Sequence, residues 1–150
     1  MRDGEDLLDV NVLLGLAWPN HLFHATARDW FDKNGERGWA TCSLTELGFI
    51  RLSANPKVFT DAVSPMEARL LLARLKKVGR HTFWQDDSEP TRLEANPSQK
   101  VVSHRQVTDG HLLDLARRRG GRLVTFDRGV SALLALNEGE ERLLVLSDSR

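Results

Sequence analysis

Short apolar segments typical of buried strands alternate along this chain with longer segments of helical periodicity. The expected strands cover residues 7–8, 39–42, 81–84, 122–126 and 143–146, and the expected helices cover residues 11–18, 21–34, 43–55, 64–78 and 107–119. Strands that alternate with helices form a parallel sheet with right-handed crossovers and helices on both faces. The order therefore predicts an α/β fold with a central, mainly parallel, five-stranded sheet. Its ligand crevice is expected beyond the carboxyl ends of the strands.

Prolines and capping residues mark the ends of several expected helices. Pro19 stops the first helix, because proline cannot continue one. Ser43 is expected to cap the third helix. Ser64 and Glu67 form a capping box that opens the fourth, with Pro65 in its first position.

The size and charge of the chain are those of a single globular domain, residues 1–150. The 150 residues carry 21 basic and 21 acidic side chains, and 41% of them are apolar. A chain of this length buries about 70% of its unfolded surface, which is enough for a core without disulfides or structural metal. The balanced charge excludes a protein that coats nucleic acid by bulk attraction, so a nucleic-acid partner has to be engaged locally.

The cysteine content and the apolar segments indicate the compartment. Cys42 is the single cysteine, which excludes an internal disulfide and every multi-thiolate zinc site. The N-terminus is acidic where a signal peptide is basic, and the longest apolar stretch, residues 12–18, is shorter than the ~20 residues of a spanning helix. We therefore expect a cytoplasmic protein without a membrane segment.

One polar segment, residues 85–100, departs from the alternation of strands and helices. It contains two prolines and few apolar residues, so we expect a long surface loop. Two interpretations stay open, a tolerated insertion and a flap that faces the substrate, since long loops in compact domains are often functional.

Four carboxylates differ from the other acidic residues because they lie in apolar surroundings. Asp9 and Asp127 each follow an expected strand. Glu46 shares a helical stripe with core residues, and Asp109 points along the buried face of the last helix. Three of them have simpler explanations: Asp9 as a helix cap, Glu46 in an internal pair with an arginine, and Asp109 as an acid favoured by the helix dipole.

Taken together, the four acids predict a metal site. A parallel sheet brings the ends of its strands and the starts of the following helices to one crevice. Carboxylates within ~5 Å of one another repel by roughly 3 kcal/mol per pair, so such a cluster needs a cation. Oxygen ligands select Mg²⁺ or Mn²⁺, and these ions at a sheet edge suit phosphodiester hydrolysis.

Other ionisable residues are expected to have simpler roles. Asp114 faces away from Asp109 and is expected in solvent, as are His111 and the acidic runs at 86–87 and 138–141. His21 and His24 lie three residues apart on a helix, but no further ligands match them, so zinc is not expected.

The acidic motifs also resemble those of a known family. The segment 7–14 (Leu-Leu-Asp-Val-Asn-Val-Leu-Leu), Glu46 after the second strand, the segment 107–109 (Val-Thr-Asp) and the segment 123–128 (Leu-Val-Thr-Phe-Asp-Arg) occur in order over nearly the whole chain. This set resembles the PIN domain, specifically the VapC-type toxins of bacterial type II toxin–antitoxin modules. The resemblance implies a PIN-like three-layer α/β/α sandwich.

The resemblance further implies a metal-dependent endoribonuclease with an acidic quartet. Asp9, Asp109 and Asp127 would hold Mg²⁺ or Mn²⁺, and Glu46 would position or deprotonate the attacking water. RNA would be the substrate, a VapB-type antitoxin would block the site, and the protein would form a homodimer.

Four residues near the quartet are expected to support it. The resemblance implies supporting roles for Asn11 and Thr125, which each lie two residues from a ligand. Arg51 and Arg128 are the nearest basic candidates for phosphate contact.

Two other classes of function fit parts of the pattern. A phosphotransferase of the haloacid-dehalogenase type would use Asp9 as its nucleophile, but its second aspartate would stand where Asn11 is. A non-catalytic PIN-like domain that binds proteins would not need all four acids in place.

Overall fold

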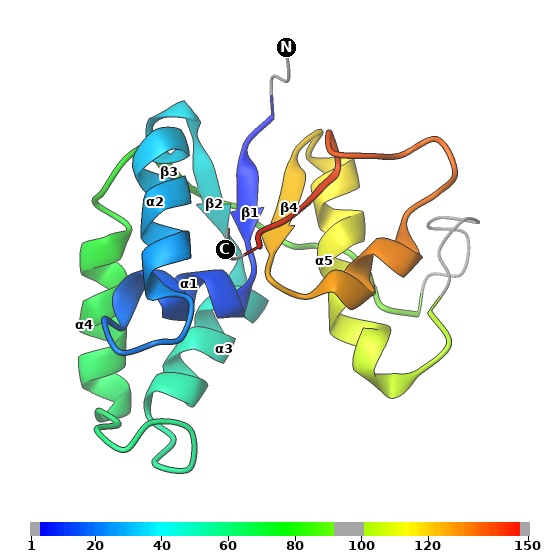
Figure 1. Ribbon diagram of the computed structural model, residues 1–150. Helices are drawn as coiled ribbons and strands as arrows, with labels where there is room; N and C mark the ends of the chain where they lie inside the picture. Colours follow the sequence, from blue (N-terminus) through cyan, green and yellow to red (C-terminus); the bar gives the residue numbers. More distant parts are fainter. Residues whose placement is uncertain (1–3, 92–100, 148–150) are drawn as a thin grey trace.

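The computed structural model describes residues 4–91 and 101–147. One sheet of five parallel strands has the order β3-β2-β1-β4-β5 (Figure 1). The strands are β1 (Asp6–Leu8), β2 (Trp39–Thr41), β3 (His81–Phe83), β4 (Arg122–Thr125) and β5 (Leu143–Val145). The predicted parallel α/β sheet is confirmed. Of the segment 85–100, residues 85–91 contain neither helix nor strand, and residues 92–100 lie outside the described part of the chain.

Helices cover both faces of the sheet, as predicted. Figure 1 shows α1 to α4 on one side and α5 on the other. The α-helices are α1 (Val10–Ala17), α2 (His24–Asn34), α3 (Ser43–Ser53), α4 (Pro65–Leu75) and α5 (Val107–Arg118), and the 3₁₀ helices are η1 (Gly35–Arg37), η2 (His104–Gln106) and η3 (Arg128–Leu133). Within residues 4–91 and 101–147, every helix is too short or too polar to span a bilayer.

Alternate residues of the strands enter two separate cores, which makes the fold three-layered. Leu8 and Val124, which are paired across β1 and β4, pack with α1 to α4. Leu7 and Leu123, the preceding pair, face the opposite way and pack with α5 and η3. The period of two along each strand therefore places helices against both faces.

The helix boundaries differ from the expected ones by a few residues. The capping box of α4 is confirmed, because the Glu67 amide donates to Ser64 Oγ at 3.1 Å and the Ser64 amide donates to Glu67 Oε1 at 3.3 Å. Ser43 does not cap α3; Cys42 does, with its amide bonded to Thr45 Oγ1 at 3.0 Å. The backbone of Cys42 is extended and that of Ser43 is already helical. Serine is a preferred N-cap residue, but in this chain it stands one position after the N-cap.

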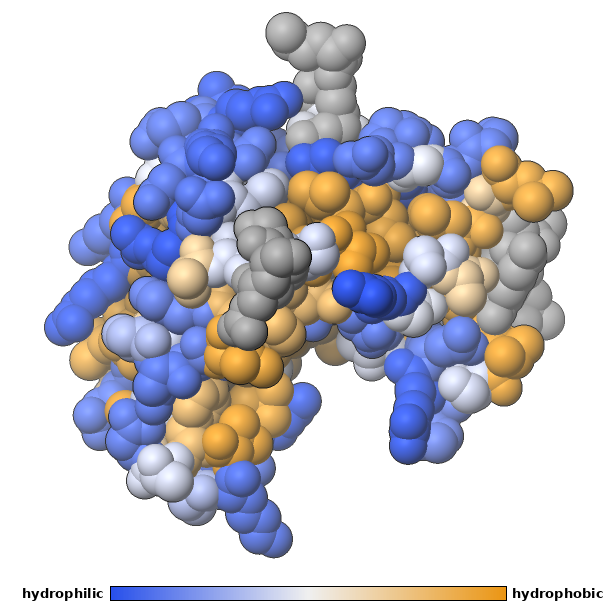
Figure 2. Space-filling view, in the orientation of Figure 1, coloured by the Kyte–Doolittle hydropathy of each residue, from blue (hydrophilic) through white to orange (hydrophobic). Residues whose placement is uncertain are grey.

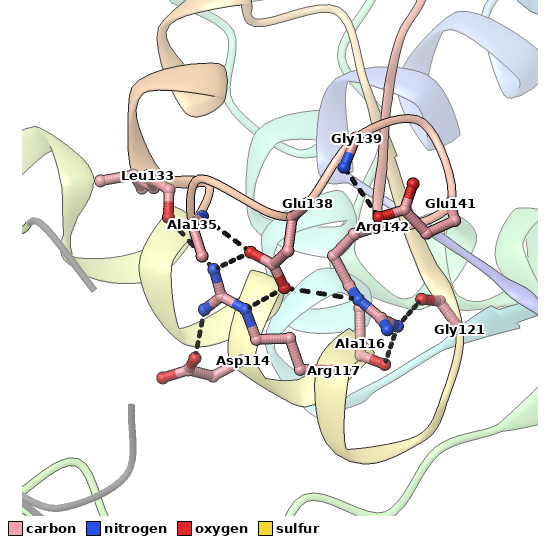
Figure 3. Close-up of polar contacts among 10 residues, drawn as sticks. All are labelled: Asp114, Ala116, Arg117, Gly121, Leu133, Ala135, Glu138, Gly139, Glu141 and Arg142. Atoms are coloured by element: carbon pink, nitrogen blue, oxygen red, sulfur yellow. Dashed lines mark hydrogen bonds and ion pairs between the residues drawn. The ribbon is translucent and has the colours of Figure 1, made fainter. Parts of the chain in front are cut away.

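Asp114 and Glu138 are not solvated, contrary to expectation. The Arg117 guanidinium on α5 donates to both oxygens of Glu138, at 2.7 and 2.8 Å, and to Asp114 at 2.5 Å (Figure 3). Arg142 lies 3.6 Å from the same Glu138 carboxylate. This cluster fastens the connection between η3 and β5 to α5, and it leaves the Asp114 and Glu138 side chains only 14% exposed.

His111 and Asp86 are also paired with each other rather than free in solvent. The His111 ring bonds to Asp86 Oδ2, and both side chains are largely buried. Burial works to raise the pKa of Asp86, but the hydrogen bonds from His111 and Ser88 and the charges of His111 and Arg118 together outweigh it, and the pKa is lowered. The pair attaches the segment after β3 to α5.

Candidate active site

Asp9 directly follows β1 at the carboxyl edge of the sheet, and it begins α1 as the N-cap. Its Oδ1 accepts the Val10 amide and its Oδ2 accepts the Thr125 hydroxyl, both at 2.8 Å. Burial raises the pKa of Asp9; the bonds from Thr125 and Val10 lower it, and the charge of Asp127 raises it further. The helix cap considered as an alternative is therefore present, and the same carboxylate also lies at the sheet edge.

The Thr125 hydroxyl, at the end of β4, connects three parts of this edge. It donates to Asp9 Oδ2, and it accepts the Asn11 side-chain amide at 3.2 Å and the Asp127 backbone amide at 3.1 Å. A hydroxyl has one proton and two lone pairs, so the capacity of Thr125 is fully used. The side-chain oxygen of Asn11, Oδ1, in turn accepts the Phe126 backbone amide at 3.3 Å. Thr125 thus bonds Asp9 directly, and Asn11 bonds Thr125 and Phe126.

Asp109 and Asp127 complete a group of three carboxylates with Asp9. Asp127 follows β4, is exposed, and accepts the Gly129 amide at 2.8 Å as the N-cap of η3. Asp109 lies in the first turn of α5. Burial, and then the charges of Asp9 and Asp127, raise the pKa of Asp109 from 3.8 to about 6. The three carboxylates are therefore close enough to repel one another. Asp9 is buried, Asp109 is partly exposed and Asp127 is exposed to solvent.

Among residues 4–91 and 101–147, no basic side chain is paired with this group of three. Among the described residues, none of the three acids forms an ion pair with lysine, arginine or histidine. At the opposite end of β1, buried Asp6 is held by the Arg122 guanidinium through bonds of 3.0 and 3.1 Å. Within the described residues, the sheet thus pairs an acid at its amino edge with arginine, whereas Asp9, Asp109 and Asp127 have no basic partner.

The carboxylate oxygens of Asp9, Asp109 and Asp127 fit a hard divalent cation by their chemistry. Oxygen ligands with negative charge are those that Mg²⁺ and Mn²⁺ prefer, and a cation would relieve the repulsion that raises the pKa of Asp109. In the part of the chain that the structure describes, no three His, Cys, Asp or Glu side chains are arranged closely enough to hold a metal ion. The donor set is therefore suitable, but it is not drawn together.

Glu46, the fourth predicted acid, is held by a different set of contacts. It lies in the first turn of α3, and its Oε2 accepts the Thr41 hydroxyl at 2.6 Å and the Lys76 ammonium at 2.8 Å. Its charge is not among those that raise the pKa of Asp9 or Asp109. The alternative of an internal ion pair is present, but the partner is a lysine and not the expected arginine.

The predicted phosphate contacts and the two helix histidines lie as follows. Arg51 on α3 and Arg128 at the start of η3 are both exposed.

The His24 ring bonds to the Gly15 carbonyl at 2.7 Å, and burial lowers the pKa of His21. Neither histidine joins a metal-binding group among the described residues.

Sequence reasoning missed the residues that hold Glu46. Thr41 ends β2, Lys76 is the C-cap of α4, and His81 begins β3. They come from three segments, and none has an unusual local pattern. Only the strand-end position of Thr41 could have indicated it, because Thr41 is the last residue of β2 as Thr125 is the last residue of β4.

Comparison with known proteins identifies close relatives. Ribonuclease VapC38 of Mycobacterium tuberculosis is 54% identical over 127 residues, which cover 85% of this chain and 88% of the relative. Ribonuclease VapC39 of the same organism is 46% identical over 125 residues, covering 83% and 90%. Ribonuclease VapC44 is 36% identical over 140 residues, covering 93% and 98%. No protein-family model matches the chain.

The parallel five-stranded sheet between two helical layers, with acids at its carboxyl edge, defines a PIN-like α/β/α domain. Within this class, all three relatives named above are VapC ribonucleases. The chain belongs to the VapC family of ribonucleases, and the resemblance seen in its sequence motifs is confirmed.

Proposed function

We propose that the chain is an endoribonuclease that hydrolyses RNA with a bound Mg²⁺ or Mn²⁺ ion, and that it is the toxin of a VapBC-type pair. The observation that carries this proposal is the group of Asp9, Asp109 and Asp127, which repel one another and have no basic partner among the described residues. The names of the relatives, all ribonucleases, support RNA as the substrate.

Each acid has a role in the proposed reaction. Asp9, Asp109 and Asp127 would hold the ion, which when bound would neutralise phosphate charge and make water more acidic. Glu46 orients the attacking water and accepts its proton. The water oxygen bonds to phosphorus, one phosphorus–oxygen ester bond breaks, and solvent protonates the leaving oxygen. Thr125 holds Asp9 in position through the 2.8 Å hydrogen bond.

The RNA backbone is proposed to contact exposed basic residues beside the acids. Arg128 follows Asp127 directly, and Arg51 lies on α3, the helix that carries Glu46. Such contacts position the substrate by charge and carry no sequence information.

The proposed protein partners are a VapB-type antitoxin and a second copy of the chain, in the cytoplasm. Large apolar side chains are exposed on α3 and α4, including Leu47 at 56% and Met66 at 62%. Figure 2 shows apolar surface at the lower left, where these helices lie in Figure 1, whereas hydrophilic surface covers α2. Contiguous exposed apolar surface is typical of interaction sites. Light scattering of the purified chain, alone and with the product of the adjacent reading frame, tests both partners.

Cleavage of a fluorescent RNA with single-stranded loops tests the activity. We expect cleavage with Mg²⁺ or Mn²⁺, none in EDTA, and none by Asp9→Asn, which keeps the side-chain shape but removes a ligand charge. Asp87→Asn is the matched control, because that side chain is 92% exposed. Cleavage that persists in EDTA would overturn the metal proposal, and a phosphorylated Asp9 would favour a phosphotransferase instead.

A further inference from the structure

Glu46 is fixed by a hydrogen-bonded chain that does not involve the three aspartates. Thr41 Oγ1 lies 2.6 Å from Glu46 Oε2 and 2.8 Å from His81 Nε2. Lys76 Nζ lies 2.8 Å from the same Glu46 oxygen. The three residues come from the end of β2, the end of α4 and the start of β3, on the side of β1 away from Asp109 and Asp127.

The direction of each hydrogen bond in this chain is determined. A carboxylate only accepts, so the single proton of the Thr41 hydroxyl goes to Glu46. Thr41 therefore has only lone pairs to offer His81, and His81 Nε2 must carry a proton. Burial, and then the charge of Lys76, lower the pKa of His81, which keeps the ring neutral at pH 7. A neutral ring with its proton on Nε2 is the single tautomer that satisfies buried Thr41.

Lys76 completes the fixation of the carboxylate. Its ammonium group lies 5.6 Å from the centre of the Phe83 ring, a cation–π contact that restrains the lysine. Thr41 and Lys76 both donate to Oε2, and within the described chain no donor bonds to Oε1. One oxygen of Glu46 is thus anchored twice, and the other is left for a further ligand.

We propose that Thr41, His81 and Lys76 are positioning residues for RNA hydrolysis, which anchor Oε2 of Glu46 so that Oε1 is presented to the attacking water. The inference rests on the proposed function of Glu46. Lys76 also places its positive charge beside the Glu46 carboxylate, whose side chain is only partly exposed. His81 does not contact Glu46 itself. It donates to the Thr41 hydroxyl oxygen, so the proton of that hydroxyl points toward Glu46.

The first experiment compares Thr41→Val with Thr41→Ser. We expect Thr41→Val to lower kcat about 10- to 100-fold with KM unchanged, as loss of supporting hydrogen bonds commonly does, and Thr41→Ser to restore it. Independently of activity, ¹⁵N NMR of the metal-free protein should show His81 protonated on Nε2, and this signal should move in Thr41→Val. A His81 ring protonated on Nδ1 alone, or a fully active Thr41→Val, would overturn the inference.

The second experiment tests Lys76 against its neighbour. We expect Lys76→Met to lower kcat at unchanged KM and Lys76→Arg to recover most of it, because arginine keeps the charge. Lys77→Met is the control, since Lys77 is exposed and makes no ion pair within the described residues. A raised KM with normal kcat in Lys76→Met would make Lys76 an RNA contact and overturn its positioning role.

Glu46→Gln distinguishes a failure of the proposed role of Glu46 from a failure of the positioning role of Thr41 and Lys76. If Glu46→Gln cleaves RNA normally, the proposed role of Glu46 fails. If Glu46→Gln is inactive while Thr41→Val and Lys76→Met are fully active, the proposed function stands and the positioning inference fails.

Discussion

Replacing Asp109 with asparagine should stabilise the metal-free protein above pH 6 and have no effect near pH 4. In the folded protein the pKa of Asp109 is raised from 3.8 to about 6, by burial and then by the charges of Asp9 and Asp127. The folded state therefore binds this proton more tightly than the unfolded state. As the pH rises from about 4 to about 6, the free energy of unfolding falls, and it stays lower at higher pH.

The size of the effect follows from the same values. A difference of about 2 pH units corresponds to about 3 kcal/mol, which is an upper bound because Asp109 is partly exposed and solvent screens its charge. Asparagine also loses the favourable interaction of an acid with the first turn of α5, about 0.5 kcal/mol. The expected net gain for Asp109→Asn is about 2 kcal/mol, or about 4–8 °C in Tm for a domain of this size.

Thermal melting in EDTA between pH 4 and pH 8 measures this difference. Asp87→Asn is the control, because it removes an acid that is 92% exposed. The lowered pKa values of Asp86 and Glu138 affect the free energy of unfolding at lower pH. They do so equally in all variants, so their contributions cancel when variants are compared. With Mn²⁺ at about 100 times its Kd, the wild type should gain about 2.7 kcal/mol and Asp109→Asn less. If the difference in Tm between Asp109→Asn and the wild type stayed constant from pH 4 to pH 8, the reasoning would be refuted.

Three further predictions concern other contacts. Thr125→Val should lose about 1–3 kcal/mol of stability in urea titrations together with most RNA cleavage, whereas Thr125→Ser should retain both, because Thr125 satisfies three hydrogen bonds at once. Arg117→Met should lose about 3–5 kcal/mol by leaving two largely buried acids unpaired, whereas Lys33→Met, which breaks a surface pair with both side chains 72% exposed, should change stability by less than about 0.5 kcal/mol. Burial raises the pKa of Cys42, so a thiol reagent should modify it only as fast as the protein unfolds; rapid labelling of the native protein would contradict its burial.

The sheet and the positions of Asp9 and Asp127 could be predicted because their signals are local. An apolar strand followed by an acid places that acid at the carboxyl edge of a parallel sheet, whatever the rest of the chain does. The pairing of β1 with β4 then brings the two acids to the same edge. Apolar periodicity and position along the strands were sufficient here.

The partners of charged residues could not be predicted in the same way. Glu138 lies in a polar run that is typical of solvent-exposed loops, yet Arg117, 21 residues earlier, binds both of its oxygens. Lys76 meets Glu46 only because α4 ends beside the start of α3. Such pairs depend on where helices and loops end in space, and a charge pattern along one segment contains no information about that.

The bond between Asp9 and Thr125 joins residues that are 116 positions apart, and this separation bears on how the protein is made. On the ribosome, β1 and α1 emerge long before α5 and β4 have been translated. Contacts so distant in sequence require the closure of a long loop and form late. Until translation has passed Asp127, the growing chain lacks at least one of the four carboxylates. If the four acids act as proposed, a fragment released by interrupted translation before that point should be unable to cut the message from which it was made.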